Sequence, residues 1–194
     1  MKLFLTLFFI NTFQVIPNLC LSEEAKNPSG EISLVTVMSN STERGGHSSL
    51  IIKSIETVIF DPAGRVRSKL LKEKADVLYD IDESLEDFYV SIHARETHHV
   101  VKQTISVSND IATKALNLAK ANGPVAPALC ARSISVLLRK LPGFGLINMT
   151  YFPEKLMKNF ADIRGVKTKK IFENDGPDKH KSLIELEKKY EIKN

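Results

Sequence analysis

The chain has 194 residues, of which 43% are hydrophobic and 26% are charged, and its formal net charge is +4. These values exclude a disordered or collagen-like chain and are typical of one globular domain with a sizeable core. The basic residues are scattered, and the small cluster at Lys167, Lys169 and Lys170 is followed at once by acidic residues. We therefore expect no nucleic-acid partner.

Residues 1–22 have the pattern of a secretory signal peptide. Lys2 is their only charged residue, an apolar run follows it, and small residues lie near Ser22 at the spacing of a cleavage site. Retention as an uncleaved anchor and lipid modification of Cys20 are the alternatives. We therefore expect an exported protein, periplasmic or secreted. Membrane association is expected only if the leader is retained or Cys20 is lipidated.

The first half of the chain predicts mostly strands. In chain order, the expected elements are a flexible entry at 23–30, strands at 31–38, 47–53 and 57–60, a basic surface helix or loop at 65–74, and a short edge strand at 76–79. A tight polar turn separates the second and third strands, which favours a hairpin. The third strand is stopped by Asp61-Pro62-Ala63-Gly64, because proline has no N–H to donate to a neighbouring strand.

The second half predicts mostly helices. In chain order, the expected elements are a helix at 83–94, a strand at 99–107, helices beginning near 109, at 130 and at 153, a strand at 166–172, and a charged surface helix at 178–190. Strands in one half and helices in the other indicate an α+β domain at 31–176, with an antiparallel sheet of about five strands packed against helices. The charged helix lies in a C-terminal segment at 177–194.

Cys130 is the candidate nucleophile. It opens an apolar helix, and removal of the leader would take away Cys20 and leave Cys130 as the one cysteine, so that no internal disulfide could form. Pro127 precedes it, where we expect a first-turn proline. The N-terminus of a helix favours the thiolate, and its backbone N–H offers one donor for an oxyanion. The alternative is an inert thiol, because free cysteine is among the most buried residue types.

His47 and Asp61 are the candidate partners of the thiol. Thiol catalysis needs an imidazole that accepts and returns a proton, and a polar group that fixes its tautomer. In an antiparallel hairpin, a histidine at the start of one strand lies beside the end of the next, so Asp61 is placed to orient His47. Glu56 and Glu43 are possible substitutes for Asp61. The remaining histidines, His93, His98 and His99, lack the spacing of metal ligands, and we expect no metal site.

Three segments together resemble the circularly permuted papain-like cysteine hydrolases. They are Gly-His-Ser-Ser-Leu-Ile-Ile at 46–52, Val-Ile-Phe-Asp-Pro-Ala-Gly at 58–64, and Ala-Leu-Cys-Ala-Arg-Ser-Ile-Ser-Val-Leu-Leu at 128–138 with Leu-Pro-Gly-Phe at 141–144. In that group the histidine strand precedes the cysteine helix, and the fold is related to that of lecithin retinol acyltransferase. The resemblance implies Cys130 as nucleophile and His47 as base; Asp61 is inferred from strand geometry alone.

The resemblance implies an amidase- or peptidase-like enzyme that acts on cell-envelope peptides or lipids without a cofactor. One departure is Leu129, because many members of the group have a polar residue just before the cysteine. Two alternatives therefore stay open. One is a catalytically silent exported domain of the same fold that binds a cell-envelope ligand, and the other is a lipid acyltransferase.

Overall fold

A computed structural model describes residues 30–191 except 65, 175 and 177. The predicted leader and nearly all of the predicted flexible entry therefore lie outside the described residues. The strands are β1 Gly30–Ser39, β2 Gly45–Lys53, β3 Thr57–Phe60, β4 Lys72–Lys74, β5 Val77–Tyr79, β6 His98–Val107 and β7 Lys167–Ile171. The helices are α1 Glu83–Ser91, α2 Asn109–Ala121, α3 Cys130–Leu138, α4 Pro153–Ala161 and α5 Lys179–Glu191.

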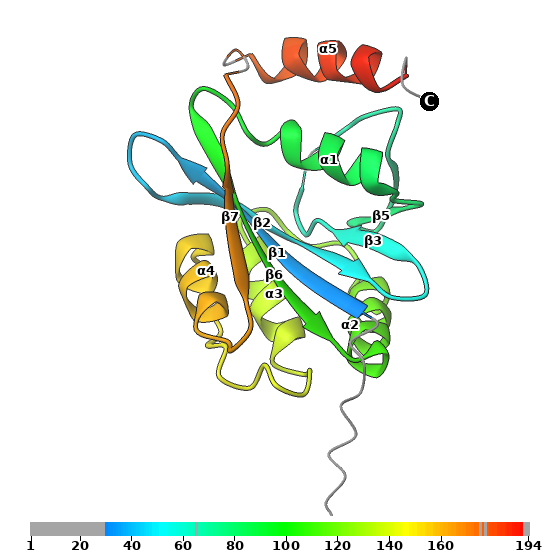
Figure 1. Ribbon diagram of the computed structural model, residues 1–194, viewed down its shortest axis with the longest axis vertical. Coiled ribbons are helices and arrows are strands. Elements are labelled where there is room, and N and C mark those ends of the chain that lie inside the picture. The colour runs from blue at the N-terminus through cyan, green and yellow to red at the C-terminus, as the bar shows by residue number, and fades with distance from the viewer. Residues whose placement is uncertain (1–29, 65, 175, 177, 192–194) are drawn as a thin grey trace, which may run out of the picture.

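The described strands form one antiparallel sheet in the order β4-β5-β3-β2-β1-β6-β7. Helices α2, α3 and α4 cover one face of this sheet, and α1 and α5 cover the other (Figure 1). Because both faces are covered, the central strands are apolar along their length rather than alternating, as in Leu50-Ile51-Ile52. Leu50 and Ile52 pack toward α2, α3 and α4, and Ile51 packs toward α1 and α5.

The α+β class is confirmed, but the expected count of about five strands is wrong, because the described residues form seven. The main error lies at 65–74, where a helix or loop was expected and β4 is found. β4 is the three-residue strand Lys-Glu-Lys, and all three residues are exposed, so it has no hydrophobic pattern. It pairs with β5 through a tight turn in which Ala75 and Asp76 both have positive φ, a conformation that alanine does not signal. β5 is consequently not the edge strand that was expected.

Two helix boundaries also differ from the prediction. The helix expected at 83–94 ends at Ser91, and the chain then turns into a small bridge between Arg95 and His98. α3 begins at Cys130 as predicted, but Pro127 is not in its first turn. It lies three residues earlier, in a turn where Ala128 has a φ of 66°.

The C-terminal helix α5 is largely exposed, but it also contributes to the core. Leu186 and Tyr190 are buried in the cluster beneath α1, and the ring of Tyr190 meets that of Phe88 edge to face at 5.2 Å. Glu187 accepts a hydrogen bond from the Ser68 hydroxyl at 2.5 Å. α5 therefore covers the same face of the sheet as α1. In the described part of the chain, no helix is both long and apolar enough to cross a membrane.

Candidate active site

The three predicted site residues come from three different elements that converge at one end of the central strands. His47 is the third residue of β2, Asp61 directly follows β3, and Cys130 is the first residue of α3. The β2–β3 hairpin pairs Leu50 with Phe60, so Asp61 lies one step further toward His47. The structure thus brings together the histidine and the acid that the sequence pattern predicted.

Asp61 holds the imidazole of His47. The Nε2 atom of His47 lies 2.5 Å from Oδ1 of Asp61 and donates its proton to the carboxylate. The same oxygen accepts a hydrogen bond from the Tyr89 hydroxyl at 2.9 Å. With Nε2 engaged by Asp61, the other ring nitrogen, Nδ1, is left for the thiol.

Cys130 is the third member of this chain of contacts. The His47 side chain and the backbone N–H groups of Ser48 and Ala131 lie close enough to its sulfur to lower the pKa of the thiol. Ser48 follows His47 on β2, so the same strand supplies both the imidazole and an amide to the sulfur. Cys130 is only 6% exposed, as either a nucleophile or an inert core thiol would be. Its polar neighbours, however, are not those of a cysteine packed only among apolar side chains.

The electrostatics of the site favour a thiolate and an imidazolium. Burial alone would lower the pKa of His47, but the hydrogen bonds and charges of Asp61 and Cys130 outweigh burial and raise it to about 9. Burial alone would raise the pKa of Cys130, yet the pKa is lowered, by the hydrogen bond and charge of His47 and by the two backbone amides. Burial alone would raise the pKa of Asp61, but the pKa is lowered by the hydrogen bond and charge of His47, by the charge of His93 and by the hydrogen bond from Tyr89. The pKa shifts of His47 and Cys130 both favour the ion pair of thiolate and imidazolium over the neutral pair.

The alternatives to Asp61 lie elsewhere. Glu56 accepts a hydrogen bond from Lys120 at 2.6 Å, at the far end of the β2–β3 hairpin. Glu43 lies in the β1–β2 turn with a φ of 52°. Of the three acids considered, Asp61 is therefore the one that meets His47.

Three further residues support the site, and the sequence did not reveal their roles. A Cβ atom on Gly64 would lie 1.9 Å from Oδ2 of Asp61, so only glycine fits where the turn folds back on that carboxylate. The Asp76 carboxylate accepts hydrogen bonds from the N–H groups of Ala63 at 3.0 Å and Val125 at 2.8 Å. It thereby ties the Asp61 turn to the segment that leads into α3. Tyr89 lies on α1, and the apolar spacing of that helix does not indicate that its hydroxyl reaches Asp61.

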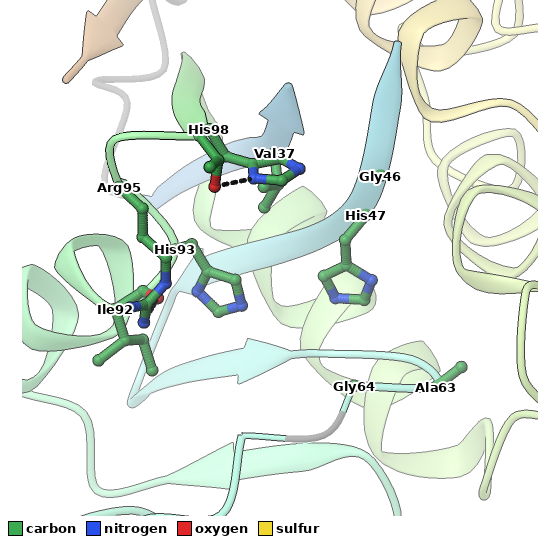
Figure 2. A pocket seen from close by; sticks show the side chains of 10 residues that line it. Val37, Gly46, His47, Ala63, Gly64, Ile92, His93, Arg95 and His98 are labelled. Carbon is green, nitrogen blue, oxygen red and sulfur yellow. Dashed lines mark hydrogen bonds between the residues drawn. The ribbon is translucent and has the colours of Figure 1, made fainter. Parts of the chain in front are cut away.

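A cavity of about 400 Å³ adjoins His47. Figure 2 shows its lining residues, which come from β1, β2, the turn after β3, the segment between α1 and β6, and the first residue of β6. The ring of His93 is stacked on that of His47, with centroids 6.0 Å apart and planes 14° from parallel. His93 is held by a 2.8 Å hydrogen bond between its Nδ1 and the Tyr89 carbonyl. The site therefore combines a thiol of lowered pKa with a cavity that adjoins its histidine partner.

The histidines outside the predicted site do not form a metal centre in the described structure. His99 bonds to the Asn40 side chain at 2.7 Å and stacks on Phe172, and His98 bonds to the Thr97 hydroxyl at 2.9 Å. Among the described residues, no three histidine, cysteine or acidic side chains are grouped to hold a metal ion.

Comparisons with family models, with curated proteins and with solved structures found no match to this chain.

Proposed function

We propose that this protein is an exported cysteine hydrolase of the permuted papain-like type, which cleaves an amide or ester bond. The observation that carries the proposal is the chain of interactions from the Cys130 thiol through the His47 imidazole to the Asp61 carboxylate. The order of its members, with the histidine strand before the cysteine helix, is that of the permuted group. Export rests on the leader-like sequence of residues 1–22.

The proposed reaction has two halves. The Cys130 thiolate attacks the carbonyl carbon of the substrate, and its electron pair forms the new C–S bond as the carbonyl oxygen becomes an oxyanion. The oxyanion collapses, the bond to the leaving amine or alcohol breaks, and the His47 imidazolium gives that group its proton. An acyl-enzyme with a neutral His47 is left. Water then attacks the thioester, His47 takes a proton from it, and the acid departs as the thiolate–imidazolium pair is restored.

The start of α3 supplies a donor for the oxyanion. The first N–H groups of a helix have no acceptor within the helix, and Cys130 is the first residue of α3. Its own N–H is therefore placed to donate to an oxygen that develops on a carbonyl bonded to its sulfur. The N–H groups of Ser48 and Ala131 instead favour the thiolate form of the sulfur before attack.

Acylation of Cys130 by an activated ester tests the proposal. With p-nitrophenyl acetate we expect a burst of nitrophenol, followed by turnover, with an acetyl group on Cys130 in mass spectra of quenched samples. Cys130→Ala should lose the burst. If the burst persists in Cys130→Ala, the proposed nucleophile is wrong. Addition of an amine or alcohol then separates hydrolysis from acyl transfer, because an acyltransferase gives the acetylated acceptor in place of acetate.

A further inference from the structure

The cavity beside His47 has a distinctive set of polar side chains. Its lining residues are Val37, Gly46, His47, Ala63, Gly64, Ile92, His93, Arg95, Thr97 and His98. None of these ten described residues is acidic, one carries a permanent positive charge, and three are histidines. The nearest carboxylate to His47, that of Asp61, is already paired with its imidazole at 2.5 Å. The lining therefore favours a negatively charged ligand.

Arg95 is the lining residue that carries the permanent positive charge. It is only 6% exposed, although arginine is almost never buried without a structural or functional reason. One reason is structural, because its Nη2 donates to the Ile92 carbonyl at the end of α1. A guanidinium presents several N–H donors in a rigid fork, so one side chain can bind both a backbone carbonyl and a carboxylate in the cavity.

The backbone around Arg95 is fixed before any ligand binds. Arg95 and His98 exchange backbone hydrogen bonds of 2.7 and 3.1 Å across a tight turn. Asn40, at the end of β1, anchors the same turn: its side-chain amide donates to the Glu96 carbonyl, and its backbone N–H donates to the Thr97 carbonyl, each at 2.9 Å. A binding site held in this way loses little conformational entropy when a ligand enters.

The cavity lies beside His47, next to the position where the substrate carbonyl would react with Cys130. Figure 2 shows the imidazole of His93 between Arg95 and His47, and its stacking on His47 puts the two rings 6.0 Å apart. Cys130 is not among the lining residues. The cavity therefore suits a group of the substrate that neighbours the reacting carbonyl, rather than that carbonyl itself.

We propose that this cavity is a subsite for a substrate carboxylate, with Arg95 as its principal binding residue and His98 at its rim. The inference rests on the proposed hydrolase function and narrows it to amides or esters that carry an acidic group beside the scissile bond. Ala63 and Gly64 form part of the wall, and their small side chains leave the room that such a group needs.

A pair of matched thiol-directed probes tests the subsite. N-iodoacetyl-aspartate α-amide and N-iodoacetyl-asparagine α-amide have the same length and differ by one carboxylate. The measured quantity is the ratio of their alkylation rates at Cys130, with the modified peptide identified by mass spectrometry. We expect Arg95→Gln to lower the ratio of acidic to neutral probe about tenfold, the effect of one lost hydrogen bond to a charged group. Arg139→Gln, at the exposed C-terminal end of α3, makes the same charge change and should keep the wild-type ratio.

His98→Glu provides a second variant in case Arg95→Gln does not fold, because His98 is only half-buried. A carboxylate at this position should repel the acidic probe and lower the ratio as well. An unchanged ratio in both folded variants would overturn the subsite while leaving the nucleophile intact.

If neither probe modifies Cys130 in the wild-type protein, the proposed catalytic function fails. A binding measurement then tests the carboxylate subsite independently of thiol reactivity. N-acetyl-aspartate α-amide and N-acetyl-asparagine α-amide are then titrated into Cys130→Ala and followed by NMR. Preference for the acidic ligand that is lost on adding Arg95→Gln supports the subsite. Equal binding of the two ligands contradicts it.

Discussion

The Nε2 atom of His47 lies 2.5 Å from Oδ1 of Asp61, although 14 residues separate them in the chain. This contact assigns the two ring nitrogens of His47, one to the acid and one to the Cys130 thiol. Because burial and charge act together here, the protonation of His47 depends on Asp61, and the protonation of Cys130 depends on His47.

The pH dependence of ester hydrolysis should be bell-shaped. Activity rises with pH as the Cys130 thiolate forms, and this limb should lie below the ordinary pKa of a thiol, because the pKa of Cys130 is lowered. Activity falls again as His47, whose pKa is raised to about 9, loses the proton that the leaving group needs. Steady-state rates across the pH range check this. A profile that rises without a descending limb would show that no imidazolium proton is used.

Asp61→Asn tests the role of the carboxylate at nearly constant volume. The amide has no charge to favour the imidazolium, so the pKa of His47 should fall and the descending limb of the pH profile should move to lower pH. We expect the rate at neutral pH to drop about a hundredfold. The control is Asp80→Asn, an exposed acid that pairs with Lys72 at 2.7 Å. Equal profiles for the wild type and Asp61→Asn would remove Asp61 from the site.

Gly64→Ala tests the fit of the turn around Asp61. The new Cβ would lie 1.9 Å from the carboxylate, so either the turn or the side chain must move. We expect the free energy of unfolding to fall by about 1–3 kcal/mol, as in other overpacked sites, and the rate of Cys130 alkylation to fall with it. Gly145→Ala is the matched control, because its Cβ meets no atom within 4 Å. Thermal unfolding and alkylation kinetics of both variants provide the measurement, and equal behaviour of the two would contradict the close approach.

Tyr89→Phe removes the hydroxyl that donates to Asp61 and leaves the ring in the core. The carboxylate then loses one of its partners in a buried site, which should raise its pKa. We expect a loss of about 1.5–3 kcal/mol in the free energy of unfolding, typical of a hydrogen bond to a charged group. This loss should shrink at acidic pH, because a protonated Asp61 needs the donor less. Denaturant titrations at neutral and acidic pH measure it, and a loss that does not change with pH would argue against the contact with a charged Asp61.

The sequence was sufficient to predict the residues that meet, because each one lies beside a structural boundary that leaves a pattern. Cys130 starts an apolar helix, His47 follows a pair of glycines, and Asp61 stands before a proline that must end a strand. Hairpin geometry then placed the acid beside the histidine, and this juxtaposition is confirmed by their 2.5 Å contact. Their catalytic roles stay a prediction.

The structural features that could not be predicted from the sequence leave no periodic pattern in it. Helical spacing turns Tyr89 inward but does not reveal that its hydroxyl reaches a carboxylate on another element. Gly64 resembles any turn glycine until the Asp61 carboxylate is seen against it. β4 is formed by pairing with β5 alone, since its exposed side chains give no alternation to detect. The Arg95 turn likewise depends on Asn40, which is 55 residues away in the chain.

The most direct test of the central claim is the rate of Cys130 alkylation by iodoacetamide, measured against pH in the wild type and in His47→Gln and followed on the Cys130 peptide. We predict that the wild-type thiol reaches half of its maximal reactivity below the ordinary thiol pKa of about 8.5. In His47→Gln the midpoint should move to higher pH, because burial then acts without the imidazolium, and labelling at neutral pH should slow at least about tenfold. Superimposable profiles for the two proteins would contradict the thiolate–imidazolium pair.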